Sequence, residues 1–327
     1  MLFAATTAVH RALYRFGVLV PQRLPVSVIV VGNLVAGGAG KTPTVIALVT
    51  WLRERGFTPG IISRGYGRRG DDVVEVLPNT PVTQAGDEPL LMRMRTGAAV
   101  VVGRDRVAAG RELLSRHPEV NVVVSDDGLQ HHRLARDVQL LVFDERGAGN
   151  GWPLPAGPMR EPMPAVLPLR SLVLYNARAA STALPGTVLQ RSLRGCVALA
   201  DWWRGHSATM PGLDALKDRS VLAAAGLARP ERFFEMLRAH GLSITTLALP
   251  DHHDFSTLPW PAATPDVLVT EKDAVKLVPT QMGRTRVWVA TLDFAFDPAF
   301  DPALAALLTP PPPPPPPPGI DHGNATA

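Results

Sequence analysis

From about residue 26 onward, short apolar runs alternate along the chain with longer amphipathic segments. The apolar runs predict buried strands, because they are short, rich in β-branched residues and bounded by turn residues. In the first half of the chain these predicted strands are 26–31, 60–63, 98–102, 120–125, 138–143 and 171–175. Helices are predicted over 43–55 and 104–116. Strands that alternate with helices predict an α/β fold with a mostly parallel sheet covered by helices on both faces.

A second series of the same kind begins near Ser220 and predicts a smaller α/β lobe. Its expected elements are strands at 220–226, 243–249, 266–270 and 286–292 and a helix at 230–240. Between the two series, residues 152–168 contain six prolines and are predicted to form a structured loop. We place the lobe boundary around residues 200–215, which divides the chain into 1–25, 26–210, 211–309 and 310–327.

The amino-terminal segment carries an apolar stripe and no acidic residue. Val9, Leu13, Phe16 and Val20 fall at helical spacing, and the first acid of the chain is Glu54. No uninterrupted apolar run approaches the roughly 18–20 residues that span a bilayer, and arginines interrupt any secretory signal. Two interpretations remain open, a helix on an anionic membrane surface or a helix packed on the protein's own core. In both, the chain is expected to stay in the cytoplasm.

Composition narrows the class of protein only a little. Hydrophobic residues make up 46% of the chain and charged residues 19%, as in an ordinary globular protein. The formal net charge of +4 is too weak to indicate nucleic-acid binding, and the single cysteine, Cys196, excludes an internal disulfide framework. Nine consecutive prolines at 310–318 predict an extended, disordered tail without a catalytic part.

The segment "VIVVGNLVAGGAGKTPT", residues 28–44, predicts a phosphate-binding loop. Its difficulty is Val35, because the strict pattern G-x-x-x-x-G-K-[ST] requires glycine there. Gly32 can replace that glycine, which lengthens the loop to seven residues between the outer glycines. A strand before the loop and a helix after it favour a phosphate site over a structural turn. The residues expected at the nucleotide are Gly37, Gly38, Gly40, Lys41 and Thr42, with the Thr42 hydroxyl on Mg²⁺.

A second glycine pattern is misleading. "GYGRRG", residues 65–70, matches the dinucleotide fingerprint, but "DDVVEV" follows where that fingerprint requires a helix. We therefore reject a Rossmann site. Tyr66 remains a candidate substrate contact, although an ordinary basic loop explains the segment equally well.

Two adjacent acids form the second strong signal. "VNVVVSDDGLQHHRL" delivers Asp126 and Asp127 at the carboxyl end of an apolar strand, where open α/β sheets bind ligands. Paired carboxylates there suit Mg²⁺ beside a nucleotide, while the alternative is a solvated Asp-Asp-Gly turn. The histidine pairs at 131–132 and 252–253 do not indicate zinc, because adjacent residues on a strand point to opposite faces.

The whole set of motifs resembles the tetraacyldisaccharide 4'-kinases, which are lipid A biosynthesis enzymes. The resemblance runs from about residue 26 to about 290 and rests on "VGNLVAGGAGKTPT", "SRGYGR", "GDEPLL", "VVVSDDGLQHHRL", "PAGPMREP", "LAAAGLARPERFF", "PDHHDF" and "VTEKDAVKL". It implies a P-loop NTPase-type lobe with a smaller α/β lobe. It also implies transfer of the ATP γ-phosphoryl group, with Mg²⁺, to the 4'-hydroxyl of a tetraacylated glucosamine disaccharide 1-phosphate.

The resemblance also implies roles for single residues. It assigns Asp87 and His252 to a catalytic pair, and Arg160 and Glu161 to the substrate side. Gln130 and His131 fall beside the metal-side acids Asp126 and Asp127. A lipid acceptor implies a peripheral enzyme at the cytoplasmic face of the bacterial inner membrane, with no nucleic acid and no obligate protein partner.

Three other classes of protein are alternatives to this kinase family. A P-loop ATPase of the partition or metallochaperone type would have another lysine early in the loop, where Asn33 and Leu34 stand. A GTPase would need N/T-K-x-D, but "TEKD" at 270–273 places its aspartate one position too early. The P-loop ATPase would also leave "GDEP" and "PDHH" without a role. A non-catalytic, nucleotide-gated membrane scaffold is the third alternative, and it stays open.

Overall fold

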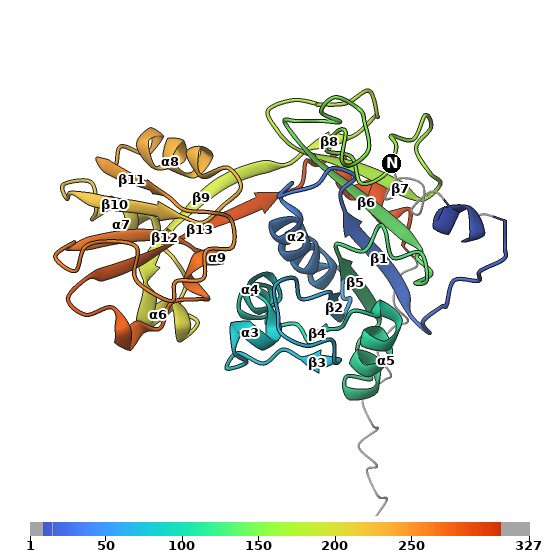
Figure 1. The fold of residues 1–327 in the computed structure, drawn as a ribbon, viewed down its shortest axis with the longest axis horizontal. Helices are drawn as coiled ribbons and strands as arrows, with labels where there is room; N and C mark the ends of the chain where they lie inside the picture. Colours follow the sequence, from blue (N-terminus) through green and yellow to red (C-terminus); the bar gives the residue numbers. More distant parts are fainter. Residues whose placement is uncertain (1–8, 15, 309–327) are drawn as a thin grey trace, which may run out of the picture.

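Two separate β-sheets organise the chain in the computed structural model, which describes residues 9–14 and 16–308 (Figure 1). The large sheet has the strand order β3-β4-β2-β5-β1-β6-β7-β8, and all its neighbours are parallel except β3 and β4. Its strands are β1 (Ser27–Gly32), β2 (Pro59–Ser63), β3 (Val74–Glu75), β4 (Val100–Val102), β5 (Val122–Asp126), β6 (Val138–Asp144), β7 (Ser171–Asn176) and β8 (Thr187–Val188). The six predicted strands are confirmed, with boundaries shifted by one or two residues.

Helices cover both faces of this sheet, which explains why its strands are almost entirely apolar. On one face, Ile29 and Val31 of β1 belong to the cluster that contains Leu48 of α2 (Lys41–Glu54). On the other, Val28 and Val30 belong to the cluster that contains Leu113 of α5 (Arg106–Arg116). The helices α3 (Val82–Ala85) and α4 (Asp87–Thr96) lie on the α2 side.

The smaller sheet has the order β11-β10-β12-β13-β9, and only β9 runs antiparallel to its neighbour. Its strands are β9 (Gln190–Ala198), β10 (Val221–Ala225), β11 (Ile244–Ala248), β12 (Asp266–Thr270) and β13 (Arg286–Ala295). The helical segments of this half are α6 (Leu199–Trp203), α7 (Met210–Asp214), α8 (Pro230–Ala239), α9 (Glu271–Ala274), the 3-10 turn η1 (Pro279–Gln281) and α10 (Phe300–Ala305).

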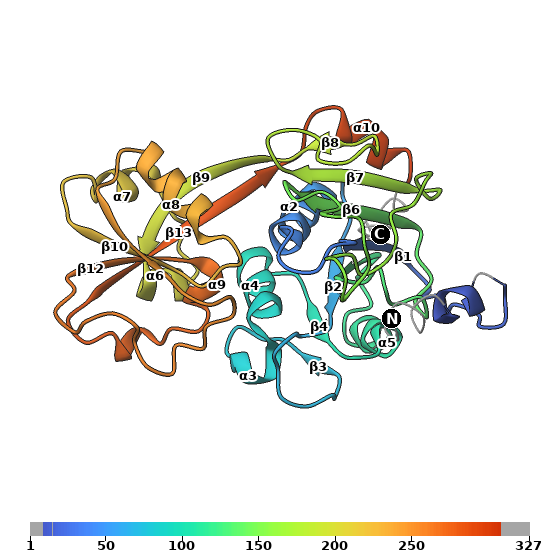
Figure 2. The ribbon, with the colours of Figure 1, turned by 45° about the horizontal axis from the view of Figure 1, so that its top comes forward.

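The two sheets divide the chain differently from the predicted boundary. β9 belongs to the smaller sheet although it ends before residue 200, because its pairing with β13 is a long-range contact. The two strands form an antiparallel ribbon between the lobes (Figure 2). After β13 the chain returns to the large lobe, where Asp301 of α10 forms an ion pair with Arg55. The predicted second lobe, 211–309, therefore lacks its first strand and includes a segment that packs on the other lobe.

The amino-terminal segment lies on the surface of the large lobe. Residues 9–14 form a short helix that contacts the protein through Arg11, whose guanidinium lies 3.6 Å from Glu161. Phe16 and Val20 are 78% and 76% exposed, so this part of the apolar stripe is not packed in the core. Within the described ranges, none of the helices is long and apolar enough to cross a membrane. The proline run falls outside the described residues.

Candidate active site

The phosphate loop connects the central strand β1 to the first turn of α2. Gly40 directly precedes the helix with φ of +93°, a conformation that favours glycine. A Cβ atom at this position would also lie 2.2 Å from Nδ2 of Asn176, which donates to the carbonyl oxygen of Ala39 at 3.0 Å. Gly37 has φ of +92°. These two glycines are therefore required by the loop conformation itself.

Gly32 has a packing role at the end of β1. It is the last residue of that strand, and a Cβ atom there would lie 2.7 Å from Cγ of Leu129. Close packing therefore requires this glycine, and its place as the outer glycine of the phosphate loop stays a prediction. The loop is instead braced by the buried Asn33, whose Nδ2 donates to the carbonyl oxygens of Val35 and Gly37.

Asn33 was missed in the sequence, although an asparagine directly after an apolar strand was a visible signal. Its Oδ1 accepts a hydrogen bond from Nζ of Lys41 at 3.2 Å, so it also positions the lysine. The proline-rich loop holds this segment from outside, because Arg160 N donates to Leu34 O at 2.7 Å. The predicted loop at 152–168 is thus ordered by its contact with the phosphate loop.

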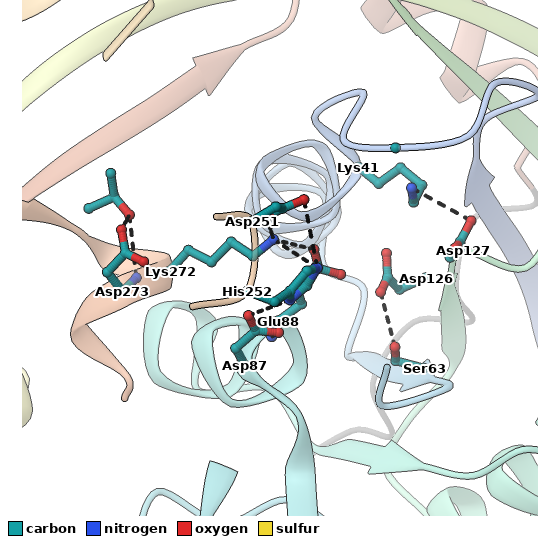
Figure 3. A network of polar contacts seen from close by, with 12 residues as sticks. Lys41, Ser63, Asp87, Glu88, Asp126, Asp127, Asp251, His252, Lys272 and Asp273 are labelled. Carbon is teal, nitrogen blue, oxygen red and sulfur yellow. Dashed lines mark hydrogen bonds and ion pairs between the residues drawn. The ribbon is translucent and has the colours of Figure 1, made fainter. Parts of the chain in front are cut away.

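Asp126 and Asp127 stand where the sequence placed them, at the carboxyl end of β5. Asp126 is buried and accepts a hydrogen bond from Ser63 Oγ of β2 at 3.0 Å (Figure 3). Burial, and then the charges of Glu88 and Asp127, raise the pKa of Asp126 to about 7. The charge of Lys41 and the hydrogen bond from Ser63 oppose this rise in pKa but do not cancel it.

Asp127 is in the opposite situation. It has φ of +47° and lies 3.7 Å from Nζ of Lys41 and 2.7 Å from the Arg160 guanidinium. Burial alone would raise the pKa of Asp127, but the charges of Lys41 and Arg160 hold it below its usual range. The two neighbouring acids thus have environments that shift their pKa values in opposite directions.

The residues predicted for Mg²⁺ fit a cation on two grounds. Oδ1 of Asp126 is buried and has no hydrogen-bond partner among the described residues, which leaves an oxygen available for a cation. Thr42 lies buried in the first turn of α2, next to Lys41. The part of the chain that the structure describes contains no cluster of three or more His, Cys, Asp or Glu side chains able to hold a metal. Mg²⁺ commonly takes one or two carboxylates and completes its shell with nucleotide phosphates and water.

Asp87 and His252, which lie 165 positions apart, are brought together from different lobes. Asp87 is the first residue of α4, and its Oδ1 accepts a hydrogen bond from the backbone N of Glu88 at 2.9 Å. Its Oδ2 lies 2.8 Å from Nδ1 of His252, which has φ of +61°. Burial alone would raise the pKa of Asp87, but the hydrogen bond with His252 and the charge of Lys272 lower it. The hydrogen bond with Asp87 raises the pKa of His252.

The remaining predicted residues lie in several different surroundings. Gln130 and Arg160 join the phosphate-loop side, since Arg160 donates to Gln130 Oε1 at 3.3 Å. Tyr66 is 65% exposed and its ring centroid lies 5.2 Å from that of His252. His131 instead faces Asp105, and burial lowers the pKa of His131 to about 4. Glu161 lies between Arg11 and His132, away from the Asp87–His252 pair.

Lys272 is a second residue that the sequence analysis missed. It lies in "TEKD", which was tested against a guanine-binding signature and forms part of one of the family motifs, without a role for the lysine. Its ammonium group reaches Asp251 at 3.0 Å, Glu88 at 3.2 Å and Nε2 of His252 at 3.3 Å (Figure 3). No local pattern marks this role, because its partners come from both lobes.

A mostly parallel sheet with a glycine loop after its central strand, a lysine opening the next helix and paired acids on the adjacent strand defines a P-loop NTPase-type protein. The sequence model of the tetraacyldisaccharide-1-P 4'-kinase family matches residues 1–309. This chain belongs to that family. As a member it is a lipid kinase, and an ATPase of the partition or metallochaperone type is not favoured.

Individual relatives agree with this assignment. The chain is 55% identical over 314 residues to a tetraacyldisaccharide 4'-kinase of Methylibium petroleiphilum, covering 94% of this chain and 88% of the relative. It is also 55% identical over 313 residues to one of Leptothrix cholodnii, covering 94% and 90%. Among solved structures, LpxK of Aquifex aeolicus in complex with ATP superposes with a TM-score of 0.75 at 27% identity, covering 94% of this chain and 96% of that one. The mixed α/β, P-loop-type fold is confirmed, and ATP binding is supported.

Proposed function

We propose that this chain transfers the γ-phosphoryl group of ATP to the 4'-hydroxyl of a tetraacyldisaccharide 1-phosphate, a lipid A precursor. The observation that carries the proposal is one cavity of about 220 Å³ that extends from the phosphate loop to the residues beside the Asp87–His252 pair. Lys41 and Thr42 of the phosphate loop line it from one side, and Glu88, Asp251 and Lys272 line it from the side of the Asp87–His252 pair. A nucleotide on the loop would therefore direct its terminal phosphate toward that pair.

The phosphate loop binds and orients the nucleotide in this proposal. The amino terminus of α2 and the Lys41 ammonium group oppose the negative charge of the phosphates. Thr42, Asp126 and Asp127 would hold Mg²⁺, which when bound neutralises charge on the phosphate oxygens. Lys41 lies close to Asp127, so the phosphate loop and the acids would contact the same phosphates at this edge of the sheet.

The Asp87–His252 pair receives the proton of the acceptor hydroxyl. The 4'-oxygen attacks the γ-phosphorus, the bond from phosphorus to the bridging oxygen of ADP breaks, and the hydroxyl proton passes to the Asp87 carboxylate. A carboxylate with a lowered pKa is a weak base for a free hydroxyl. In a loose transition state, however, the hydroxyl acidifies only as its bond to phosphorus forms, so the proton leaves late. His252 holds the carboxylate in place for that step.

The acceptor also determines where the enzyme works. Because it carries four acyl chains, its disaccharide lies at a bilayer surface, and we propose that the chain acts there as a peripheral protein on the cytoplasmic face of the inner membrane. The exposed side chains of Phe16, Val18 and Val20 support this proposal. No partner protein or nucleic acid is part of it.

The test is incubation of the purified protein, as sole catalyst, with radiolabelled ATP and a tetraacyldisaccharide 1-phosphate in mixed micelles. Labelled lipid on a thin-layer plate is the expected result. Lys41→Met should lower labelling by orders of magnitude, because it removes a charge that stabilises the transferring group. Lys217→Met, which changes a half-exposed lysine paired with Asp214, is the matched control. Release of inorganic phosphate without labelled lipid would instead identify an ATPase.

A further inference from the structure

The ammonium group of Lys272 lies on the far side of the His252 ring from Asp87. Lys272 belongs to α9 in the smaller lobe, and its side chain is only 15% exposed. Its Nζ lies 3.3 Å from Nε2 of His252, while Nδ1 of the same ring lies 2.8 Å from Asp87 (Figure 3). Both ring nitrogens are therefore occupied by charged protein groups of opposite sign.

This geometry determines which nitrogen carries the proton. A lysine ammonium group has three donors and no acceptor, so Nε2 must offer it a lone pair. The ring proton then lies on Nδ1 and is donated to Asp87, which leaves the imidazole neutral and the carboxylate ionised. An imidazolium ring would place an N–H group against the ammonium group instead.

Carboxylates on both lobes hold the ammonium group in this place. Asp251 lies 3.0 Å away on the His252 loop, and Glu88 lies 3.2 Å away in the first turn of α4, next to Asp87. Burial alone would lower the pKa of Lys272, but Glu88, Asp87 and Asp251 raise it, so the side chain stays charged at every working pH. Glu88 belongs to the large lobe, so Lys272 completes the arrangement only while the two lobes are in contact.

We propose that Lys272 is a positioning residue for phosphoryl transfer, which keeps His252 neutral and in the Nδ1-protonated form and so orients Asp87 toward the acceptor hydroxyl. The inference rests on the proposed kinase function. It adds a residue that acts through His252 and does not itself contact the reacting atoms. Its action depends on a charge at Nε2, which distinguishes it from a residue that only stabilises the fold.

The groups around His252 determine the expected effect on pH dependence. Asp87 of α4 and Asp251, whose carboxylate lies 3.9 Å from Nε2, both favour the charged ring. Lys272 opposes it directly, and Tyr66 contributes a ring contact. Beyond them, Glu88 faces Lys272, and Lys276 lies 3.9 Å from Asp87. Removing the Lys272 charge therefore leaves His252 easier to protonate, so activity should be lost at a higher pH as the solution is acidified.

The first test measures kcat and KM against pH for Lys272→Met and Lys272→Arg. Lys272→Met should move the acid limb of kcat upward by about one pH unit. It should also lower kcat near neutrality by about tenfold while leaving the KM for ATP unchanged. Lys272→Arg keeps the positive charge, so the acid limb of its kcat should stay at the pH of the unaltered enzyme. The control Lys217→Met should give the same kcat, KM and pH profile as the unaltered enzyme. If Lys272→Met lowers kcat by the same factor at every pH and leaves the acid limb at its original pH, Lys272 has only a structural role and the proposal is overturned.

The second test needs no variant at position 272 and no activity. Ring-¹⁵N-labelled histidine spectra of the full-length protein report the tautomer of His252, assigned by the signal missing in His252→Gln. A neutral ring protonated on Nδ1, above the pH of the acid limb, is expected, and an Nε2-protonated ring would refute the proposal even if Lys272→Met does not fold. Absence of labelled lipid with the unaltered enzyme would refute the kinase function, and the tautomer would still be measurable.

Discussion

From the hydrogen bond between Asp87 and His252 we predict how much kcat falls when either residue is replaced. Asp87→Asn keeps the size of the side chain and an oxygen for the Glu88 N–H group, but it removes the charge. Lys276, whose side chain is 6% exposed, keeps Asp273 at 3.3 Å, so the substitution does not leave a buried lysine unpaired. His252→Ala removes the partner from the other lobe. The two changes therefore break one interaction from opposite sides.

The magnitude follows from the kind of interaction. A positioned base contributes about 10²–10⁴-fold to the rate of proton transfer, so each single variant should lose roughly that factor in kcat. A hydrogen bond to a charged group is worth about 1.5–3 kcal/mol, which corresponds to roughly 10–150-fold in rate. If Asp87 acts only when His252 holds it, the double variant should be no slower than the slower single variant. The coupling free energy then equals the smaller of the two single losses, which is about 2.7 kcal/mol for a 10²-fold loss.

The assay is kcat for lipid phosphorylation at saturating ATP and acceptor, for the unaltered enzyme, both single variants and the double variant. Calorimetric ATP binding, expected to be unchanged, shows that the phosphate loop is intact. Asp254→Asn alters an exposed acid on the same loop as His252 and is the matched control. Losses that multiply in the double variant, within error, would show that the two residues act independently.

Three further predictions concern the loop, the core and the surface. Gly40→Ala should weaken ATP binding, measured by calorimetry, at least tenfold, because the new methyl group overlaps Asn176 and Gly40 has a left-handed backbone conformation. Gly38→Ala is the comparison, and it should bind ATP much more tightly than Gly40→Ala. Leu48→Ala, at a fully buried position under the sheet, should lower the free energy of unfolding in urea by about 2–5 kcal/mol, and a loss below 1 kcal/mol would contradict that packing. Deleting residues 1–20 should leave a folded protein that floats less with anionic vesicles, and unchanged flotation would mean that another surface binds the membrane.

The elements that the sequence predicted well are those whose signal is local. The strands of the large sheet are buried on both faces, so their apolar runs are continuous and bounded by turns. The phosphate loop and its lysine form one short segment of the sequence, and the paired acids are neighbours in another. Their positions at the ends of β1 and β5 follow from parallel strands, whose carboxyl ends share one edge. The pair of Asp87 and His252, which are distant in the sequence, was indicated by the family resemblance and not by hydrophobic periodicity.

Other features depended on contacts between distant segments. β9 was missed because charged residues interrupt its apolar pattern, and only its pairing with β13 makes it a strand of the smaller sheet. The packing role of Gly32 was missed, because it depends on the approach of Leu129 to β1. The residues next to a strand in the sequence do not show which strand it pairs with. The residues next to a glycine do not show which distant side chain packs against that glycine.

The sequence by itself determined the class of the protein, because the phosphate loop and the metal-side acids each need only a strand and the turn that follows it. The tertiary structure decided how the acceptor side is built. Asp87 and His252 meet only because the smaller lobe contacts α4 of the large lobe, and Lys272 acquires its partners from both lobes in the same way. Ionisable side chains are common on any surface, and their chemistry here comes from burial and from neighbours that are remote in the chain.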